Sequence, residues 1–533
     1  MRKSNRFLIA VITVAFLLTG CGGNAAEGVQ ITLSDDEIMV DGKEISTSED
    51  SAVYVGADII YYEEGKDEAY GEGSKEDEHS KEEAEKHTVV TITKPGTYTV
   101  SGSLSYGQIA IDLGKDADED AAAVVNLVLN GVDINCDVAS GIVVLNAYEC
   151  GDDDEDNATP TVDTSGAGFN LILAKDSVNV INGSHVAKIY KDDTTKEDVE
   201  NDKAKKKYKF DAAIDSQVSF NIDAQKNGKL IVNADNEGIS SALHMTVNGG
   251  EIVINSGDDA INTSKDNVSV LTINGGVLTC DSGLGDEGDG IDSNGYITMN
   301  GGYVIACANA KSMDSGIDSD LGIYTNGGTL LASGNMYDEI EKDSEQLFMV
   351  LNFSDKIKED ELIMVADAED KPILAFSAVN DYTVAAYSSP ELAEGTYHLY
   401  KVSSVTGDLN GSIYTNITDY TDAMQLQTGG GFMMGGPGMG GGKGQMPDGD
   451  MPQLPEDFDP EMFEGRMPSG DVPAMADGKR PELPEGEMPQ MPDGERPEGG
   501  RGFGGNQMQD EVTTEFVFSR ESYQFGGIAE NSD

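Results

Sequence analysis

The sequence predicts an all-β protein whose central part is a right-handed parallel β-helix with coils of about 26 residues. Three observations predict this fold class. The tripeptide NGG recurs every 26 residues, apolar residues alternate with period two around it, and a Gly/Ala-Ile-polar motif separates successive NGG turns. A β-sandwich is the alternative all-β fold, but it does not require these motifs to recur in one fixed order.

The NGG turns separate two predicted strands in each repeat. In the first repeat, Met245 and Val247 precede the turn while Ile252 and Ile254 follow it, so each strand has one buried face. Two glycines between the strands allow a sharp corner with a positive φ angle. The four turns begin at Asn248, Asn274, Asn300 and Asn326.

A third predicted strand in each repeat is centred on an isoleucine within AIDS, GISS, AINT, GIDS or GIDS. These isoleucines are Ile214, Ile239, Ile261, Ile291 and Ile317. When they are aligned, acidic residues gather at the positions just before and just after them. In a parallel β-helix, residues at one aligned position stack about 4.8 Å apart.

Like charges at that spacing repel by roughly 0.9 kcal/mol per pair in water, and by more where they are partly desolvated. Calcium would neutralise them, because it binds six to eight oxygens from carboxylates, carbonyls and water. The alternative is a solvated acidic edge without an ion. The candidate calcium ligands are Asp215, Asp258, Asp259, Asp286, Asp289, Asp292, Asp314 and Asp318.

Composition narrows the class of partner. The formal net charge of −62 makes nucleic acid a very poor partner and favours divalent cations, or polymers bridged by them.

Four cysteines other than Cys21 are too sparse for a disulfide scaffold, and we interpret them as mostly buried thiols with no pairing assigned. They are Cys136, Cys150, Cys280 and Cys307.

The N-terminus predicts export. Basic residues precede the apolar run FLIAVITVAFLL, and LTGC follows it, which resembles the lipobox of bacterial lipoproteins. We therefore predict a signal peptide over 1–21, cleavage before Cys21, lipidation of its thiol, and an extracellular protein anchored to the membrane at the cell surface. The alternative is an ordinary signal peptide with an unrelated cysteine.

The rest of the chain divides by composition. The charged stretches 62–87 and 188–209 are predicted to be loops. The tract GGGFMMGGPGMGGGKGQMPDGDMPQ has a composition typical of disorder. Binding of a soft metal such as Cu(I) by its methionines is the alternative. The predicted divisions are an N-terminal segment with an acidic linker (22–87), the parallel β-helix (88–334), a small C-terminal β region (335–427), a disordered Met/Gly/Pro-rich tract (428–510), and a final strand with a tail (511–533).

NGG coils interleaved with GIDS, after TYTVSG and LNGVDI and before SSPELAEGTYHLY, resemble the bacterial carbohydrate-binding domain-containing proteins over roughly residues 88–427. The resemblance implies a calcium-containing β-helix, similar in fold to calcium-dependent pectate lyases, that binds acidic plant polysaccharide and cellulose. It assigns no individual residues here.

Three functions are compatible with these features. The leading hypothesis is a monomer that binds polysaccharide through calcium, with Tyr296, Tyr303 and Tyr324 either stacking on sugars or simply filling the coils. The second is a calcium-dependent polysaccharide (pectate) lyase, for which Lys265 and Lys311 are the available bases beside the acidic turns. A lysine next to several carboxylates stays charged, so a salt bridge is its ordinary role. The third is an adhesin or structural protein that calcium stiffens.

Overall fold

The computed structural model describes residues 28–429 and 512–531, and this part of the chain consists almost entirely of strands and turns. The all-β prediction is therefore confirmed. The predicted signal peptide, Cys21, and residues 430–510 of the predicted disordered tract lie outside the described residues. Within those residues, no helix has both the length and the apolar character needed to cross a membrane.

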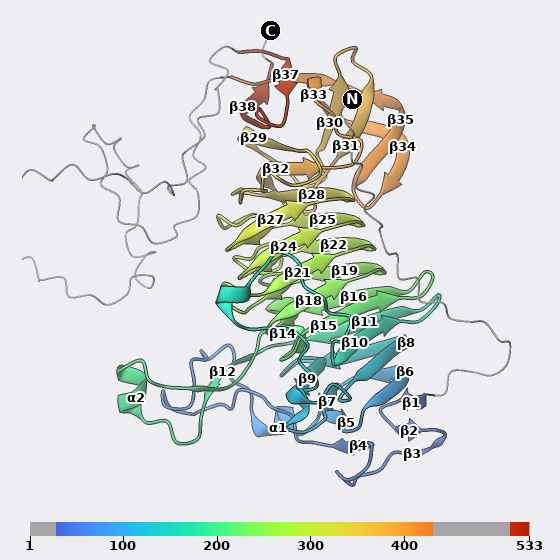
Figure 1. Ribbon diagram of the computed structural model, residues 1–533, viewed down its shortest axis with the longest axis vertical. Coiled ribbons are helices and arrows are strands. Elements are labelled where there is room, and N and C mark those ends of the chain that lie inside the picture. The colour runs from blue at the N-terminus through green and yellow to red at the C-terminus, as the bar shows by residue number, and fades with distance from the viewer. Residues whose placement is uncertain (1–27, 430–511, 532–533) are drawn as a thin grey trace, which may run out of the picture. The chain divides into compact units, whose positions relative to one another are not determined.

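The repeats form three stacks of strands that pair in parallel and in register (Figure 1). The chain visits the stacks in turn, so each repeat supplies one strand to each of them. Stack 1 contains β10 (Phe169–Leu173), β15 (Phe220–Ala224), β18 (His244–Val247), β21 (Val270–Ile273), β24 (Tyr296–Met299) and β27 (Gly322–Thr325). Stack 2 contains β11 (Val178–Gly183), β16 (Lys229–Ala234), β19 (Glu251–Asn255), β22 (Val277–Asp281), β25 (Tyr303–Cys307) and β28 (Thr329–Gly334).

Stack 3 carries the isoleucine motifs. Its strands pair in parallel except at the first pair, which is antiparallel. Ile214, Ile239 and Ile261 are register partners, as their alignment in the sequence predicted. The strands are β4 (Val53–Gly56), β5 (Thr88–Ile92), β7 (Gly107–Asp112), β9 (Ile142–Asn146), β14 (Ala212–Ser216), β17 (Glu237–Ser241), β20 (Ile261–Thr263), β23 (Asp292–Ser293) and β26 (Asp318–Ser319).

The NGG turns join stacks 1 and 2, and their residues explain why the motif recurs. The second glycine of each turn has a positive φ, which is 110° at Gly250 and 96° at Gly276. The asparagines stack into a ladder in which each side-chain amide donates to the side-chain oxygen of the previous one, over 2.9 Å from Asn274 to Asn248 and 3.0 Å from Asn300 to Asn274. The ladder ties each repeat to the one before it.

The N-terminal region adds strands to the stack. β1 (Val29–Leu33) pairs in parallel with β6 (Gly96–Leu104), and β6 pairs with β8 (Val125–Cys136), which meets both β10 and β11. Ile31 and Leu33 are buried by this pairing, which gives the segment its place in the core. Two further strands, β2 (Met39–Val40) and β3 (Lys43–Glu44), extend the edge.

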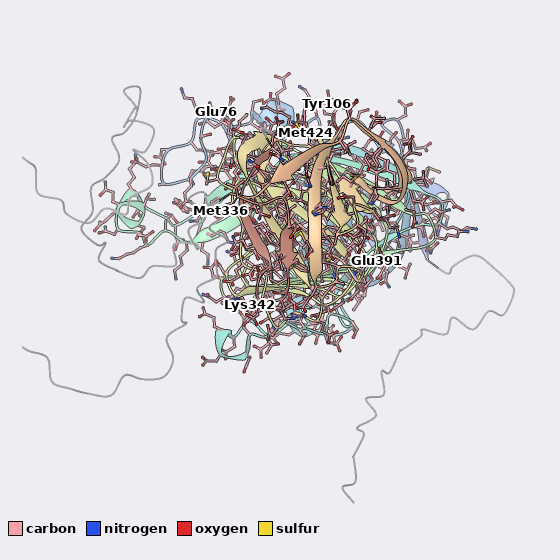
Figure 2. The ribbon with its side chains drawn as sticks, turned by 90° about the horizontal axis from the view of Figure 1, so that it is seen from above. Glu76, Tyr106, Met336, Lys342, Glu391 and Met424 are labelled. Atoms are coloured by element: carbon pink, nitrogen blue, oxygen red, sulfur yellow. The ribbon has the colours of Figure 1, made fainter. Side chains whose placement is uncertain are left out.

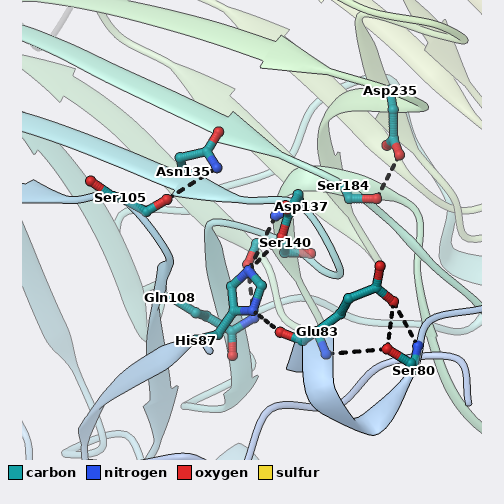
Figure 3. Close-up of polar contacts among 10 residues, drawn as sticks. All are labelled: Ser80, Glu83, His87, Ser105, Gln108, Asn135, Asp137, Ser140, Ser184 and Asp235. Atoms are coloured by element: carbon teal, nitrogen blue, oxygen red, sulfur yellow. Dashed lines mark hydrogen bonds and ion pairs between the residues drawn. The ribbon is translucent and has the colours of Figure 1, made fainter. Parts of the chain in front are cut away.

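The loop prediction holds for most of 62–87, which contains one short helix, but it is wrong for 188–209. The second stretch contains most of the hairpin β12 (Val186–Tyr190) and β13 (Lys206–Phe210), with α2 (Lys196–Glu200) between its strands. The first contains α1 (Lys81–Ala84), whose capping box joins Ser80 and Glu83 (Figure 3). Aromatic and small side chains among the charges, such as Tyr62, Ala84 and Phe210, are buried and anchor both excursions.

The C-terminal region ends the parallel stacking. β32 (Tyr382–Ser388) pairs antiparallel with β28, and the other strands gather around it (Figure 1; Figure 2 shows them lying over the stack). Antiparallel pairing therefore covers the last edge of stack 2. These strands are β29 (Phe348–Ile357), β30 (Leu362–Asp367), β31 (Pro372–Phe376), β33 (Gly395–Val402), β34 (Ser404–Asn410), β35 (Ile413–Thr421), β36 (Met424–Gln427), β37 (Phe516–Phe518) and β38 (Gln524–Glu530).

The cysteines among the described residues are free thiols. Cys136, Cys280 and Cys307 are buried, while Cys150 is half-buried. Burial raises the pKa of the Cys136 thiol to about 12, so it stays protonated and packs as a small apolar side chain. The prediction of mostly buried thiols is confirmed.

Candidate metal centre

The acidic residues gather on one face of stack 3. The residue after each motif isoleucine forms one register row: Asp215, Ser240, Asn262, Asp292 and Asp318. Register partners in a parallel stack lie about 4.8 Å apart, so Asp292 and Asp318 are direct neighbours. The alignment made from the sequence therefore identified the correct row.

Three carboxylates converge at this row. Asp289, Asp292 and Asp318 each offer an oxygen, and these oxygens lie within 4.8 Å of one another. Asp292 and Asp318 come from β23 and β26, whereas Asp289 comes from the turn that leads into β23. All three side chains are partly buried. Carboxylate oxygens in this arrangement suit a hard divalent cation.

Neighbouring backbone groups hold the carboxylates in place. The backbone N–H of Asp289 donates to Oδ1 of Asp259 over 2.7 Å, and the backbone N–H of Ser315 donates to Oδ1 of Asp289 over 2.6 Å. Asp314 accepts from the backbone N–H of Gly288 over 2.7 Å through its Oδ2. Each of these bonds crosses between adjacent repeats, so the stacking of the strands also orients the acids.

The charges within the cluster are poorly compensated. Burial, followed by repulsion from Asp318, raises the pKa of Asp292 to about 7. Burial also raises the pKa of Asp289 and Asp259 well above the usual value, with repulsion from other acids adding to the effect. The pKa of Asp258 and of Asp318 is raised for the same reasons. A proton or a bound cation would relieve this cost.

Glu237 and Asn262 belong to the site although the sequence analysis did not select them. Glu237 is 6% exposed and Asn262 8%, and the amide of Asn262 donates to Oε1 of Glu237 over 3.0 Å. Glu237 Oε2 and Asn262 Oδ1 are buried and have no hydrogen-bond partner among the described residues. Two oxygens without donors, beside Asp259, fit a cation. The isoleucine alignment had placed both residues in the acidic columns, so the signal was present.

Asp338 is a second residue that the sequence analysis missed. Its Oδ2 accepts from the backbone N–H of Ser319 over 3.1 Å, and burial, followed by repulsion from Asp318, raises its pKa to about 7. Asp338 follows the last predicted repeat, so no repeated motif marks its position. It extends the acidic row past β26.

Two predicted ligands lie apart from the three converging carboxylates. Asp215 stands at the other end of the row, and its oxygens accept hydrogen bonds from the backbone N–H of Asp211 and the side-chain amide of Gln217. Burial, followed by repulsion from Asp211, raises the pKa of Asp215 to about 7. The Asp286 side chain is 93% exposed and lies 2.7 Å from Nζ of Lys311.

The lysines near the acids are held in ion pairs. Lys311 pairs with Asp286 as above, and Lys265 lies 3.6 Å from Asp153. The interpretation that only these two lysines stand beside the acidic turns is wrong, because Lys209 lies 2.6 Å from Asp211. Burial lowers the pKa of Lys209, but the nearby carboxylates outweigh burial and raise it overall. Lys209 was missed because it lies on β13, in a stretch predicted to be a loop.

The three tyrosines do not form one surface. Tyr296 and Tyr324 lie on neighbouring strands β24 and β27, with ring centroids 6.4 Å apart and planes inclined by 47°. Tyr303 lies on β25 in stack 2 and packs against the hydrophobic core. Burial, followed by the charge of Glu391, raises the pKa of its hydroxyl. Tyr296 and Tyr324 are thus a pair, and Tyr303 is separate from them.

The loop between β9 and β10 covers part of the outer face of stack 1. Thr164 bonds to the side chains of Asn221 and Thr246, each over 2.7 Å, and Thr298 donates to the backbone oxygen of Pro160. This loop restricts the outer face of stack 1, whereas the acidic row on stack 3 lies on another face.

The sequence profile of a family described as "carbohydrate-binding domain-containing protein" matches residues 86–165 and 155–367, which together make up more than half of the chain. The chain belongs to this carbohydrate-binding domain-containing family. The matched residues include all of the predicted calcium ligands, from Asp215 to Asp318. Among curated proteins, no relative matches this family member.

One solved structure is similar to this member of the carbohydrate-binding domain-containing family. It is described as a polysaccharide lyase-like protein from C. thermocellum, solved as a gadolinium derivative. The sequence identity is 20% and the TM-score 0.30, and the match covers 56% of this chain and 92% of the other.

Proposed function

We propose that this protein binds polysaccharide at the cell surface through calcium held on the acidic row of stack 3. The observation that carries the proposal is the convergence of Asp289, Asp292 and Asp318. Membership of the carbohydrate-binding domain-containing family supports a polysaccharide as the partner.

We also propose that the three stacks form a right-handed parallel β-helix. The in-register parallel pairing supports it, because successive strands of one stack are separated by one strand from each of the other two. Such a coil places equivalent residues of successive repeats in straight rows. The acids of successive repeats therefore form a row and not a single pair.

The residues that would hold calcium differ in role. Asp289, Asp292 and Asp318 would supply carboxylate oxygens at one position, and Glu237, Asn262 and Asp259 would supply a second group of oxygens further along the row. Bound calcium supplies positive charge and open coordination positions for the carboxylates of a polyuronate. The backbone N–H groups of Asp289 and Ser315 keep the acids oriented.

Binding without cleavage fits the surroundings better than a lyase does. Removal of the proton next to a uronate carboxylate requires an uncharged lysine or arginine as base. Lys209, Lys265 and Lys311 are each paired with a carboxylate, which keeps a lysine charged. We therefore propose a binding protein, monomeric and anchored through lipid on Cys21, rather than an enzyme.

The test uses the chain from residue 22 onward. Retention on immobilised polygalacturonate and cellulose is measured with calcium and with EDTA, for wild type and for Asp292→Asn/Asp318→Asn. We expect calcium-dependent retention on polygalacturonate that the double variant loses. Retention that EDTA leaves unchanged would refute the role of calcium. Release of unsaturated uronide products, seen as new ultraviolet absorbance, would identify a lyase, and failure to bind any polysaccharide would leave an adhesin or structural protein.

A further inference from the structure

A cavity of about 180 Å³ opens on the outer face of stack 3, near its N-terminal end. Its floor is formed by residues of β5, β7 and β9, and Tyr54 and Phe210 are aromatic residues that line it. Phe210 comes from the end of the β12–β13 hairpin, which packs over this part of the sheet. A cavity of roughly 150 Å³ holds a benzene ring, so this one has room for a single six-membered ring with substituents.

The cavity and the acidic row lie on the same register row of the same sheet. Tyr54, Thr91, Ala110 and Val143 are successive register partners, and Val143 pairs with Asp215, where the acids begin. Val143 is four strands from Asp292, a separation of about 19 Å at the usual strand spacing. One polymer chain can therefore contact both places.

The groups that line the cavity are those that recognise a sugar ring. Asp58 and Asp112 provide carboxylates, and Thr91 and Gln108 are buried polar residues on the floor, 7% and 5% exposed. The amide nitrogen of Gln108 donates to the backbone oxygen of Ser140 over 2.7 Å (Figure 3). That bond leaves the side-chain oxygen as an acceptor for a ligand hydroxyl.

Charge selects the kind of sugar. The described residues that line the cavity include two carboxylates and neither lysine nor arginine. A uronate would bring a third negative charge into this space, whereas a neutral pyranose brings hydroxyl donors for the carboxylates and C–H groups for Phe210 and Leu145. The acidic row, which would hold calcium, has the opposite preference.

We propose that this cavity binds one neutral pyranose unit, with its hydroxyl groups donating hydrogen bonds to Asp58 and Asp112. The inference rests on the proposed function only in taking a saccharide as the ligand. It assigns neutral units of a polysaccharide to the cavity and acidic units to the row beside it.

The experiment titrates methyl glucoside, methyl galactoside and galacturonate into the chain from residue 22 onward, by saturation-transfer NMR, with and without calcium. Ala110→Phe fills the cavity from its floor, and Asp58→Ala removes one carboxylate from an exposed position. Asp50→Ala is the control, because Asp50 is exposed and does not line the cavity.

We expect a neutral glycoside to bind in the millimolar range without calcium, and its affinity to fall at least tenfold in Ala110→Phe and Asp58→Ala but not in Asp50→Ala. Equal binding by the filled and open proteins would overturn the inference. So would the absence of neutral binding to wild type, and in that case calcium-dependent retention on polygalacturonate would show that the proposed function still holds. Loss of neutral binding in Asp58→Ala alone, with a normal thermal unfolding curve, supports the cavity even if Ala110→Phe fails to fold.

Discussion

Replacing Asp292 by asparagine should stabilise the calcium-free protein while removing the part of its calcium response that comes from the site at Asp289, Asp292 and Asp318. Burial and repulsion from Asp318 raise the pKa of Asp292 from 3.8 to about 7, a difference worth up to about 4 kcal/mol once the group is ionised. Because Asp292 and Asp318 share this repulsion, we expect that neutralising Asp292 raises the free energy of unfolding by about 2–4 kcal/mol. A carboxyl whose pKa is higher in the folded than in the unfolded state makes its full contribution to stability below pH ~4. That contribution is lost as the pH rises from there through about 7.

Thermal unfolding of the chain from residue 22 onward measures both effects. In EDTA at pH 8, Asp292→Asn should unfold about 2–5 °C above wild type, and at pH 4 the difference should disappear. Calcium at one hundred times its Kd for the site at Asp289, Asp292 and Asp318 should stabilise wild type by about 2.7 kcal/mol, and the variant should lack this contribution. Asp286→Asn is the matched control, because Asp286 is exposed and paired with Lys311, and it should show neither effect.

Two results would refute this reasoning. A lower Tm for Asp292→Asn in EDTA would mean that the ionised carboxylate stabilises the fold, so the cluster would be neither strained nor in need of a cation. A calcium-induced shift of the same size in the variant would place the ion elsewhere.

Three further predictions concern the fold. Gly250→Ala should lower the free energy of unfolding by about 1–3 kcal/mol in a thermal or denaturant scan, because Gly250 has φ 110° and a Cβ there would lie 2.9 Å from Leu173. Gly249→Ala is the control. A Cβ at Gly249 would have no atom within 4 Å, so this variant should change stability little. Burial lowers the pKa of His185, but Asp235 and Asp77 outweigh it and raise the pKa to about 9. Through these ion pairs, charged His185 stabilises the packing of residues 62–87 fully below pH ~6.5, and this stabilisation is lost as the pH rises through about 9. Proteolysis within 62–87 should therefore become faster as the pH rises. An equal increase of the proteolysis rate in His185→Gln would contradict this reasoning. Of the described thiols, only half-buried Cys150 should react with a thiol reagent before unfolding, and a fast phase that persists in Cys150→Ser would contradict the burial of the others.

The repeats made much of the fold predictable. An alignment on Ile214, Ile239 and Ile261 gave the observed register, because a side-chain period of two and constant coil geometry leave little freedom for another pairing. The same alignment placed Asp292 beside Asp318. The strand-to-strand neighbours of the site were therefore available from sequence alone.

What was missed depends on contacts outside the repeat. Lys209 reaches Asp211 from the end of a hairpin strand with only two aromatic residues among its lysines, too short an alternation to be recognised beside the charged loop residues. Asp338 joins the row from beyond the last repeat, where no motif fixes its position. Glu237 and Asn262 were visible in the alignment, but only burial without hydrogen-bond donors distinguishes them from ordinary polar residues.

The asparagine ladder gives each repeat matching upper and lower surfaces, and this has an evolutionary consequence. Asn274 accepts from Asn300 in the same way that Asn248 accepts from Asn274. Removing residues 275–300 would join Asn274 to Gly301 and bring together two surfaces that already have the right shape for each other. A lineage can therefore lengthen or shorten this protein by whole repeats through unequal recombination, and the number of acidic rungs becomes a trait that copy number alone can change.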